Sequence, residues 1–281
     1  MLTIAPLKEI FREHGFRPLK RLGENYLIDP NIKDKIIAAA SLSAQDTVLE
    51  IGPGFGAITA DIAGSGARVF AVEKDKKAFS ILSGMMSKSF PNLTLVQGDI
   101  LEFDLKGMMG AADKIKVIGN LPYYITTPII EYLIANRAAV SSAIVMVQRE
   151  FADRILAAPG EEDYASLSCF VRYYMKPAHI HTVSRASFYP EPDVDSSLIR
   201  IDLLDTPSVD VRDEELLFRI IRGAFNQRRK SIINSLSREG VLDMPKEDLS
   251  GILAGLRIDP RIRPERLGLD DFAKIANSLA G

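Results

Sequence analysis

The sequence predicts an α/β fold in which helices cover both faces of a mostly parallel sheet, followed by a small all-helical C-terminal domain. Up to Leu204, short apolar and β-branched segments alternate with helix-like segments, which is typical of βαβ units. The strand-like segments are almost continuously apolar, as expected of strands buried on both faces. After Leu204 only helical patterns remain. The segment Asp205–Ser208 therefore marks the boundary between a domain of residues 1–204 and a domain of residues 205–281.

Each expected element follows from its local pattern. Runs of β-branched and other apolar residues predict five strands: Thr47–Ile51, Arg68–Glu73, Leu93–Gln97, Ile115–Gly119 and Ala143–Gln148. Helices are expected between these strands at Ile58–Ala63, Lys76–Ser89 and Thr126–Asn136. Two later runs have the spacing of a hairpin at the sheet edge: Ala178–Val183 and Ser197–Leu204. In the C-terminal domain, apolar residues at helical spacing predict Asp213–Phe225, Arg228–Arg238, Lys246–Leu256 and Asp270–Leu279.

Composition narrows the class of protein. The 281 residues are 47% hydrophobic and 26% charged, which excludes a disordered or fibrous chain. The net charge of −2 excludes a uniformly basic coat for nucleic acid, but it leaves room for local basic patches. The single cysteine, Cys169, excludes an intramolecular disulfide and favours a reducing compartment. Because no apolar run reaches the ~18 residues of a membrane span and Met1–His14 is unlike a signal peptide, we expect a cytoplasmic protein without membrane contact.

The residues that most often bind metals give no metal signal. His14, His179 and His181 have no cysteine partners and no metal-ligand spacing. His179 and His181 alternate along a predicted strand and would share one of its faces, which favours a structural role. Cys169 lies in a helix-like apolar run and is expected to be buried and unreactive. We therefore expect no metal site.

A glycine-rich loop follows the first predicted strand. Gly52, Gly54 and Gly56 stand between Thr47–Ile51 and a predicted helix, where glycines allow a tight turn and close approach of the backbone to a ligand. Glu73 ends the next strand, where its carboxylate can accept hydrogen bonds from ribose hydroxyls. This strand–turn–helix arrangement predicts a nucleotide site at the carboxyl edge of the sheet.

The loop alone leaves two kinds of nucleotide open. With Ala57 it satisfies the relaxed pattern of nicotinamide-dinucleotide sites, so an oxidoreductase is one candidate. With Glu50 just before it and Pro53 inside it, the loop is more similar to that of sites for S-adenosylmethionine than to that of nicotinamide-dinucleotide sites. Asp99, after the third strand, resembles the acid that binds the adenine amine of that cofactor. These residues favour S-adenosyl-L-methionine.

The four residues after the fourth strand favour a methyltransferase. Asn120-Leu121-Pro122-Tyr123 resembles the signature of enzymes that methylate exocyclic amines of bases. The lone pair of such an amine is delocalised into the ring, so the nitrogen is a poor nucleophile. The Asn120 oxygen and a backbone carbonyl, expected to be that of Leu121, can each accept one N–H and favour pyramidal nitrogen. Pro122 fixes the turn, and Tyr123 can stack on the base.

These motifs together resemble the ribosomal RNA adenine dimethylases over nearly the whole chain. The resemblance implies a Rossmann-like class I methyltransferase sheet with S-adenosyl-L-methionine as the cofactor. Arg21–Leu27 is similar to a segment that lies across the cofactor in that family. The resemblance implies these cofactor-binding residues: Asn25, Leu27, Gly52, Gly54, Glu73, Asp99 and Asn120. Glu24 stands where the family commonly has Gln, which leaves the role of that position open.

The same resemblance identifies candidate RNA contacts. Phe188–Ser196 is similar to a loop whose phenylalanine faces the target base from the side opposite the tyrosine, which implies that Tyr123 and Phe188 hold the base. Arg228, Arg229 and Lys230 belong to a block that matches the family's helical domain. Basic residues supply most of the sequence-independent affinity for RNA by neutralising phosphates. We therefore expect residues 205–281 to form an RNA-binding domain and these three side chains to contact RNA.

The resemblance implies dimethylation of two adjacent adenosines in the 3′-terminal hairpin of small-subunit (16S) ribosomal RNA, inside an assembling 30S particle. One alternative is a large-subunit (23S) RNA methylase of the macrolide-resistance type, which usually has Ile at the position of Leu121. A second is a ribosome assembly factor that binds RNA without methylating it. The nicotinamide oxidoreductase remains a third. We expect a monomer.

Overall fold

A computed structural model describes residues 3–18, 25–105, 107 and 114–280, and Glu24 lies outside these residues. The chain forms two compact units. The first consists of Met1–Ala152 with Ala178–Asp205, and the second of Asp153–Pro177 with Thr206–Gly281. The C-terminal part of the second unit begins at Thr206, and the unit also includes Asp153–Pro177, a segment within the range predicted for the first domain.

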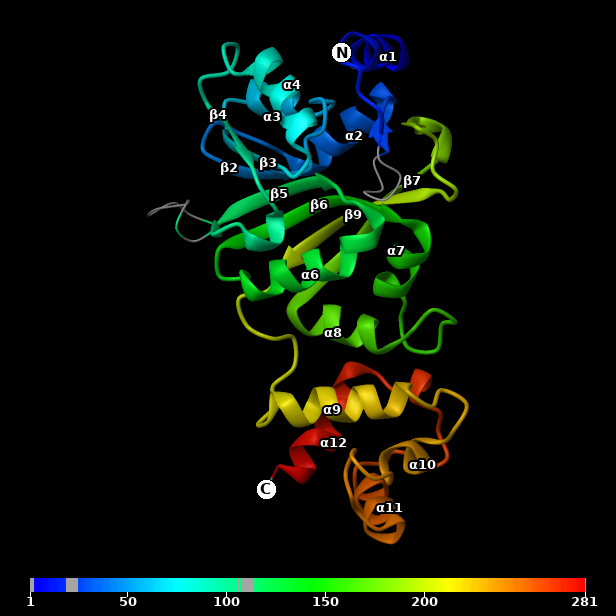
Figure 1. Ribbon diagram of the computed structural model, residues 1–281. Coiled ribbons are helices and arrows are strands. Elements are labelled where there is room, and N and C mark those ends of the chain that lie inside the picture. The colour runs from blue at the N-terminus through cyan, green and yellow to red at the C-terminus, as the bar shows by residue number, and fades with distance from the viewer. Residues whose placement is uncertain (1–2, 19–24, 106, 108–113, 281) are drawn as a thin grey trace. The chain divides into compact units, whose positions relative to one another are not determined.

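A seven-stranded sheet organises the first unit, in the order β4-β3-β2-β5-β6-β9-β7 (Figure 1). Its strands are β2 (Thr47–Ile51), β3 (Arg68–Glu73), β4 (Leu93–Gln97), β5 (Ile115–Asn120), β6 (Val140–Gln148), β7 (Met175–Val183) and β9 (Ser196–Leu203). In this order, every neighbouring pair of strands from β4 to β6 is parallel, and β9 pairs antiparallel with β6. Every predicted strand is confirmed, and the mostly parallel Rossmann-like sheet with it.

Helices lie on both sides of this sheet (Figure 1). In the first unit they are α1 (Ile4–Glu13), α2 (Pro30–Ala40), α3 (Thr59–Gly64), α4 (Lys76–Met86) and α6 (Thr126–Ala135). The apolar residues of α2 and α3 share one core cluster with Val48, Val69 and Ile144 of the strands. Asp29 and Asp75 cap the N-termini of α2 and α4 through their carboxylates. The sequence predicted α3, α4 and α6 but not α1 or α2.

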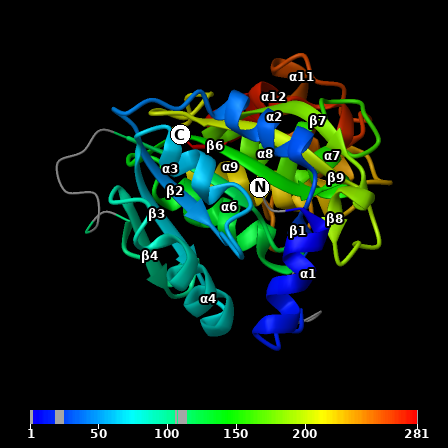
Figure 2. The same cartoon turned by 90° about the horizontal axis from the view of Figure 1, so that it is seen from above.

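A short ribbon connects the N-terminal segment to the loop before β9. Strands β1 (Tyr26–Leu27) and β8 (Phe188–Tyr189) pair antiparallel, beside α1 (Figure 2). The rings of Phe11, Phe16, Tyr26 and Phe55 pack against one another with centroids 4.8–6.3 Å apart. This aromatic cluster places Tyr26 on the glycine loop.

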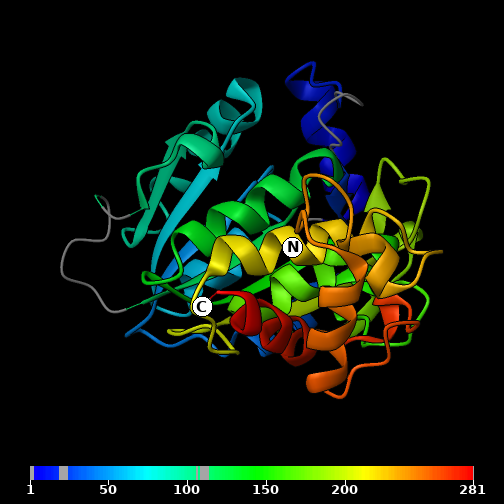
Figure 3. The same ribbon diagram turned by 90° about the horizontal axis from the view of Figure 1, so that it is seen from below.

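The second unit is helical. Its helices are α8 (Ser166–Tyr174), α9 (Glu214–Phe225), α10 (Ile232–Leu236), α11 (Lys246–Gly255) and α12 (Leu269–Leu279), and α7 (Arg149–Leu156) crosses the boundary between the units. Figure 3 shows α9 in yellow beside α12 in red, in agreement with their contacts. The segment before residue 177 belongs here because α8 packs on α9. The hydroxyls of Tyr173 and Tyr174 both donate to the Glu214 carboxylate, at 3.1 and 2.5 Å.

One helix prediction in this unit is wrong at its start. Residues 226–230 form turns, and α10 begins at Ile232 rather than Arg228. The Ile232 N–H donates to the carbonyl of Ile262, a residue far along the chain. This long-range bond, which no local pattern encodes, sets the beginning of the helix.

Candidate active site

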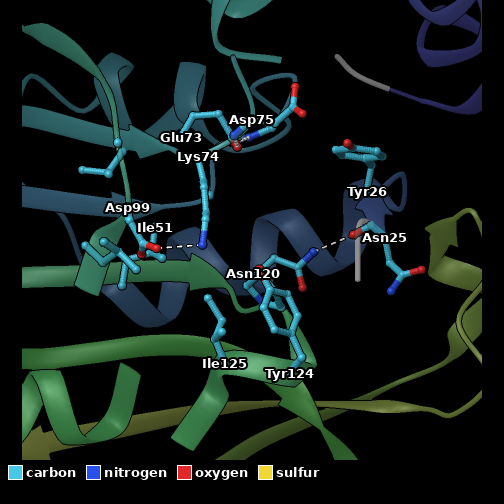
Figure 4. A pocket seen from close by; sticks show the side chains of 16 residues that line it. Asn25, Tyr26, Ile51, Glu73, Lys74, Asp75, Asp99, Asn120, Tyr124 and Ile125 are labelled. Atoms are coloured by element: carbon cyan, nitrogen blue, oxygen red, sulfur yellow. Dashed lines mark hydrogen bonds and ion pairs between the residues drawn. The ribbon is translucent and has the colours of Figure 1, made fainter. Parts of the chain in front are cut away.

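The main pocket lies at the carboxyl edge of the parallel strands, where the sequence placed the nucleotide. The glycine loop follows β2, Glu73 ends β3, Asp99 follows β4 and Asn120 ends β5. All four meet around one cavity (Figure 4). Counted with its open mouth, this cavity holds about 730 Å³ of space, enough for a nucleoside-sized ligand. The parallel register brings these side chains together, because every strand from β2 to β5 ends on the same side.

Glu73 fixes the glycine loop as well as facing the pocket. Its Oε2 accepts a 2.9 Å hydrogen bond from the Gly54 N–H, and its Oε1 accepts a 2.8 Å bond from the Asp75 N–H. Gly54 has a φ of +56°, and a Cβ there would lie 3.0 Å from the Tyr26 ring, so only glycine fits. Each carboxylate oxygen can accept a second bond, so Glu73 can hold the loop and a ribose hydroxyl together.

Asp99 is held by an ion pair inside the pocket. The Lys74 Nζ lies 2.7 Å from its Oδ2, and the Leu101 N–H donates to its Oδ1 at 3.0 Å (Figure 4). Partial burial would raise the pKa of Asp99, but the bonds from Lys74 and Leu101 outweigh it and hold that pKa below its ordinary value. The carboxylate is therefore ionised at neutral pH and ready to accept a further N–H, such as that of an adenine amine. Sequence reasoning did not identify Lys74.

The side chain of Asn120 has a defined orientation. Its Nδ2 donates a 2.7 Å hydrogen bond to the backbone carbonyl of Asn25 (Figure 4). Because a carbonyl only accepts, this bond distinguishes the two ends of the amide and leaves Oδ1 turned away from Asn25 as an acceptor. Two of the residues predicted to contact the cofactor, 95 positions apart in the sequence, are thus in direct contact. Leu121 is buried, and its N–H donates to Met146 of β6, which fixes the backbone after Asn120.

The two tyrosines of the motif have different surroundings. The hydroxyl of Tyr123 shares a 2.8 Å hydrogen bond with Ser196 of β9, and burial raises the pKa of this phenol. Tyr124, which the sequence analysis did not single out, is 49% exposed and lines the main pocket together with Pro122. The nearest sequence signal for Tyr124 was its position directly beside the motif.

Two predicted contact residues are packed into the core. Phe188 is 3% exposed and Leu27 4% exposed, and both belong to the apolar cluster under α2 and α3. They are also register partners in the β1–β8 ribbon. In this position neither face of the Phe188 ring is open to a base. Stacking of a base on this ring therefore requires the β1–β8 ribbon to move. Leu27 lines a smaller cavity beside the main pocket.

The three basic residues predicted to contact RNA differ from one another. All three are exposed, in the turn that follows α9. Arg228, however, donates from its Nη2 to the backbone carbonyls of Glu162 and Tyr164, at 2.6 and 3.0 Å. These bonds give Arg228 a structural role within the second unit. Arg229 and Lys230 are the better candidates for contacts with phosphates.

Glu50, which the sequence analysis used only as a loop marker, is a buried acid beneath the glycine loop. It is 1% exposed, and neither carboxylate oxygen has hydrogen-bond geometry with any described residue. Burial raises its pKa to about 8; the nearby Thr59 hydroxyl opposes this and the charge of Glu73 adds to it. An ionised carboxylate without a partner is costly to bury, so Glu50 holds its proton at neutral pH.

Replacing Glu50 by glutamine will change how stability depends on pH. Between the unfolded pKa of 4.5 and the folded pKa of about 8, only the folded protein keeps the proton, so the wild type loses stability as pH rises through this range. Glu50→Gln has no such proton. Denaturant unfolding is measured at pH 5, 6, 7 and 8. The free energy of unfolding of the variant should rise relative to that of the wild type by up to ~1.4 kcal/mol per pH unit. Parallel stability curves would contradict this assignment.

No three His, Cys, Asp or Glu side chains of the described residues form a group able to hold a metal ion. The structure also contains no helix, over the ranges it describes, long and apolar enough to cross a membrane.

Comparison with known proteins gives one consistent result. The family model of ribosomal RNA adenine dimethylase matches residues 15–280. A protein of Moorella thermoacetica named ribosomal RNA small subunit methyltransferase A is 43% identical over 278 residues, which cover 96% of this chain and 95% of the relative. A dimethyladenosine transferase from Plasmodium falciparum superposes with a TM-score of 0.77 at 28% identity, covering 89% of this chain and 95% of that one. The 23S rRNA methyltransferase ErmE superposes with a TM-score of 0.71 at 22% identity, covering 91% and 99%, and so supports the fold alone.

Proposed function

This chain belongs to the ribosomal RNA adenine dimethylase family, and we propose that it dimethylates N6 of two adjacent adenosines in the 3′-terminal hairpin of small-subunit ribosomal RNA. The methyl donor is S-adenosyl-L-methionine. The observation that carries the proposal is the Asn120 amide, held by Asn25 at the edge of a pocket that also contains Glu73 and Asp99.

The donor set of the pocket fits this cofactor. Two carboxylates, Glu73 and Asp99, can accept from the ribose hydroxyls and the adenine amine. Gly52 and Gly54 line the pocket without side chains, and Asn25 and Tyr26 line it as well. When bound, the cofactor supplies an electrophilic methyl group on a sulfonium.

The residues after β5 act on the target amine. Asn120 Oδ1 and the Leu121 carbonyl accept its two N–H groups, which holds the nitrogen in place and favours the pyramidal geometry in which its lone pair can attack. The bond from Asn120 to Asn25 prevents the amide from turning over. Pro122 keeps the following backbone in a fixed turn, and Tyr123, anchored on Ser196, provides an aromatic face beside the site.

The proposed substrate is RNA inside an assembling small subunit, and residues 205–281 serve as an RNA-binding domain. We place the reaction in the cytoplasm, and we propose that the enzyme acts as a monomer. Arg229 and Lys230 are exposed and positively charged, and their backbone lies in a turn of this domain.

Changing Arg229 and Lys230 together to alanine will weaken binding to the ribosomal particle and leave cofactor affinity unaltered. Each lost phosphate contact should lower the log–log slope of binding against salt by about 0.7–0.9. The matched control is Lys35→Ala with Lys88→Ala, two exposed lysines of the first unit that remove the same charge. Filter binding across a salt series distinguishes the pairs. Identical slopes for both variants would remove the patch from the RNA interface.

The proposed function is tested by offering both ribosomal subunits. Undermethylated small and large subunits are incubated separately with labelled S-adenosyl-L-methionine and the protein. Label should enter small-subunit RNA. Label in large-subunit RNA alone would instead favour the rival methylase, and label in neither would favour a factor that binds without methylating.

A further inference from the structure

A second, smaller cavity adjoins the main pocket beneath the glycine loop. Glu50 lines it, together with Ile36 of α2 and apolar side chains of the loop between β2 and α3, such as Phe55 and Ile58. The two cavities share three of their lining residues: Tyr26, Gly52 and Asn120. The unpartnered carboxyl of Glu50 therefore lies next to the part of the pocket where Asn120 holds the target amine.

This part of the pocket has to accommodate positive charge. The methyl that is transferred must lie beside the amine held by Asn120, and in S-adenosyl-L-methionine that methyl is carried by a sulfonium, a few bonds from an ammonium. A cation within roughly 4–6 Å favours the ionised form of a carboxyl. Neither oxygen of Glu50 accepts a bond from a described residue. The nearby Thr59 hydroxyl favours the ionised form, but too weakly to offset the effect of burial.

We propose that Glu50 releases its proton when the cationic end of the cofactor binds, so that binding of the cofactor is coupled to the loss of one proton. The inference rests on the proposed function, because it takes S-adenosyl-L-methionine as the ligand. Glu50 then carries the negative charge that balances the bound cation.

Of the groups around this cavity, Glu50 is the one suited to release a proton when the cofactor binds. Glu73, on β3, is the charged group that faces it, and this carboxylate already accepts two backbone N–H bonds. Tyr26, on β1, lines the same cavity with its phenol ring. Thr59, on α3, and Asn120, on β5, do not titrate. No Lys, Arg or His of the described chain lines this cavity.

The test is calorimetric titration at pH 7 in buffers of different ionisation enthalpy, which counts the protons released per ligand bound. Three ligands are compared: S-adenosyl-L-methionine, S-adenosylhomocysteine and 5′-methylthioadenosine. With a pKa of about 8 for Glu50 in the free protein, the wild type should release close to one proton with the cationic cofactor. 5′-Methylthioadenosine lacks both cationic groups and should release none. S-Adenosylhomocysteine keeps only the ammonium, so release with it assigns the effect to the ammonium, and release with the cofactor alone assigns it to the sulfonium.

Two variants complete the experiment. Glu50→Gln should bind the cofactor without proton release, and its affinity should not vary between pH 6 and 8, whereas the affinity of the wild type should rise up to about tenfold per pH unit. Glu131→Gln, at an exposed site on α6, should behave as the wild type. Should Glu50→Gln fail to fold, infrared difference spectra of the wild type give the same answer, since a protonated carboxyl band should disappear on binding.

The possible results separate this inference from the proposed function. Binding of the cofactor without proton release, or release that persists in Glu50→Gln, overturns the inference and leaves the methyltransferase assignment intact. If none of the three ligands binds, the proposed cofactor is wrong and the inference falls with it.

Discussion

Replacing Asn120 by alanine will slow methyl transfer by ~10²–10³-fold, if the loss resembles that of an oxyanion-hole donor. The substitution removes the Oδ1 acceptor that is needed most as the amine loses its planarity. It also removes the Nδ2–H bond to the Asn25 carbonyl, which sets the orientation of the amide. Cofactor affinity should change much less, because Glu73 and Asp99 remain.

Single-turnover kinetics separate these two effects. With enzyme in excess over undermethylated particles, the rate of the chemical step is measured directly, and calorimetry gives the cofactor affinity of the same preparation. Asn120→Asp is the informative companion, since it keeps an acceptor oxygen but lacks the donor to Asn25, and an intermediate rate is expected. Near-normal transfer by Asn120→Ala would remove this residue from the chemical step.

Replacing Glu73 by alanine will weaken binding of S-adenosyl-L-methionine by roughly 10- to 100-fold. Hydrogen bonds to a charged group contribute ~1.5–3 kcal/mol each, and the ribose bonds are lost. The structure adds a second cause, because the same carboxylate accepts the N–H groups of Gly54 and Asp75 and so holds the loop in its binding conformation.

Calorimetry with a folding control tests this expectation. Glu73→Gln retains one acceptor oxygen for the loop and should lose less affinity than Glu73→Ala. Circular dichroism should show both variants folded, since the substitution lies at a strand end rather than in the apolar core. Unchanged affinity in Glu73→Ala would exclude Glu73 from the cofactor site.

The sheet and the position of the pocket could be predicted because both follow from local patterns. Buried parallel strands are continuous apolar runs, and parallel strands necessarily bring the residues after them to one edge. The strands Thr47–Ile51, Arg68–Glu73 and Leu93–Gln97 agree with their predictions residue for residue. Glu73, Asp99 and Asn120 consequently line one cavity, as that topology requires.

The features that were missed depend on contacts between distant parts of the chain. The covered position of Phe188 results from its pairing with Leu27, and the structural role of Arg228 from carbonyls more than sixty residues away. Lys74 gave no signal of its own, since its importance arises from the carboxylate that β4 brings beside it. A lysine at a strand end is ordinarily a solvated side chain.

The central claim is that the pocket around Asn120 methylates adenine N6 in small-subunit RNA. The most direct measurement is nucleotide-level mapping of the methyl groups, by mass spectrometry of RNA fragments from undermethylated small subunits treated with the protein and S-adenosyl-L-methionine. The account predicts N6,N6-dimethyladenosine at two adjacent positions of the 3′-terminal hairpin, and its absence when Asn120→Ala replaces the wild type over the same time. Methyl groups on another base, on another atom of adenine or in another part of the RNA would contradict it.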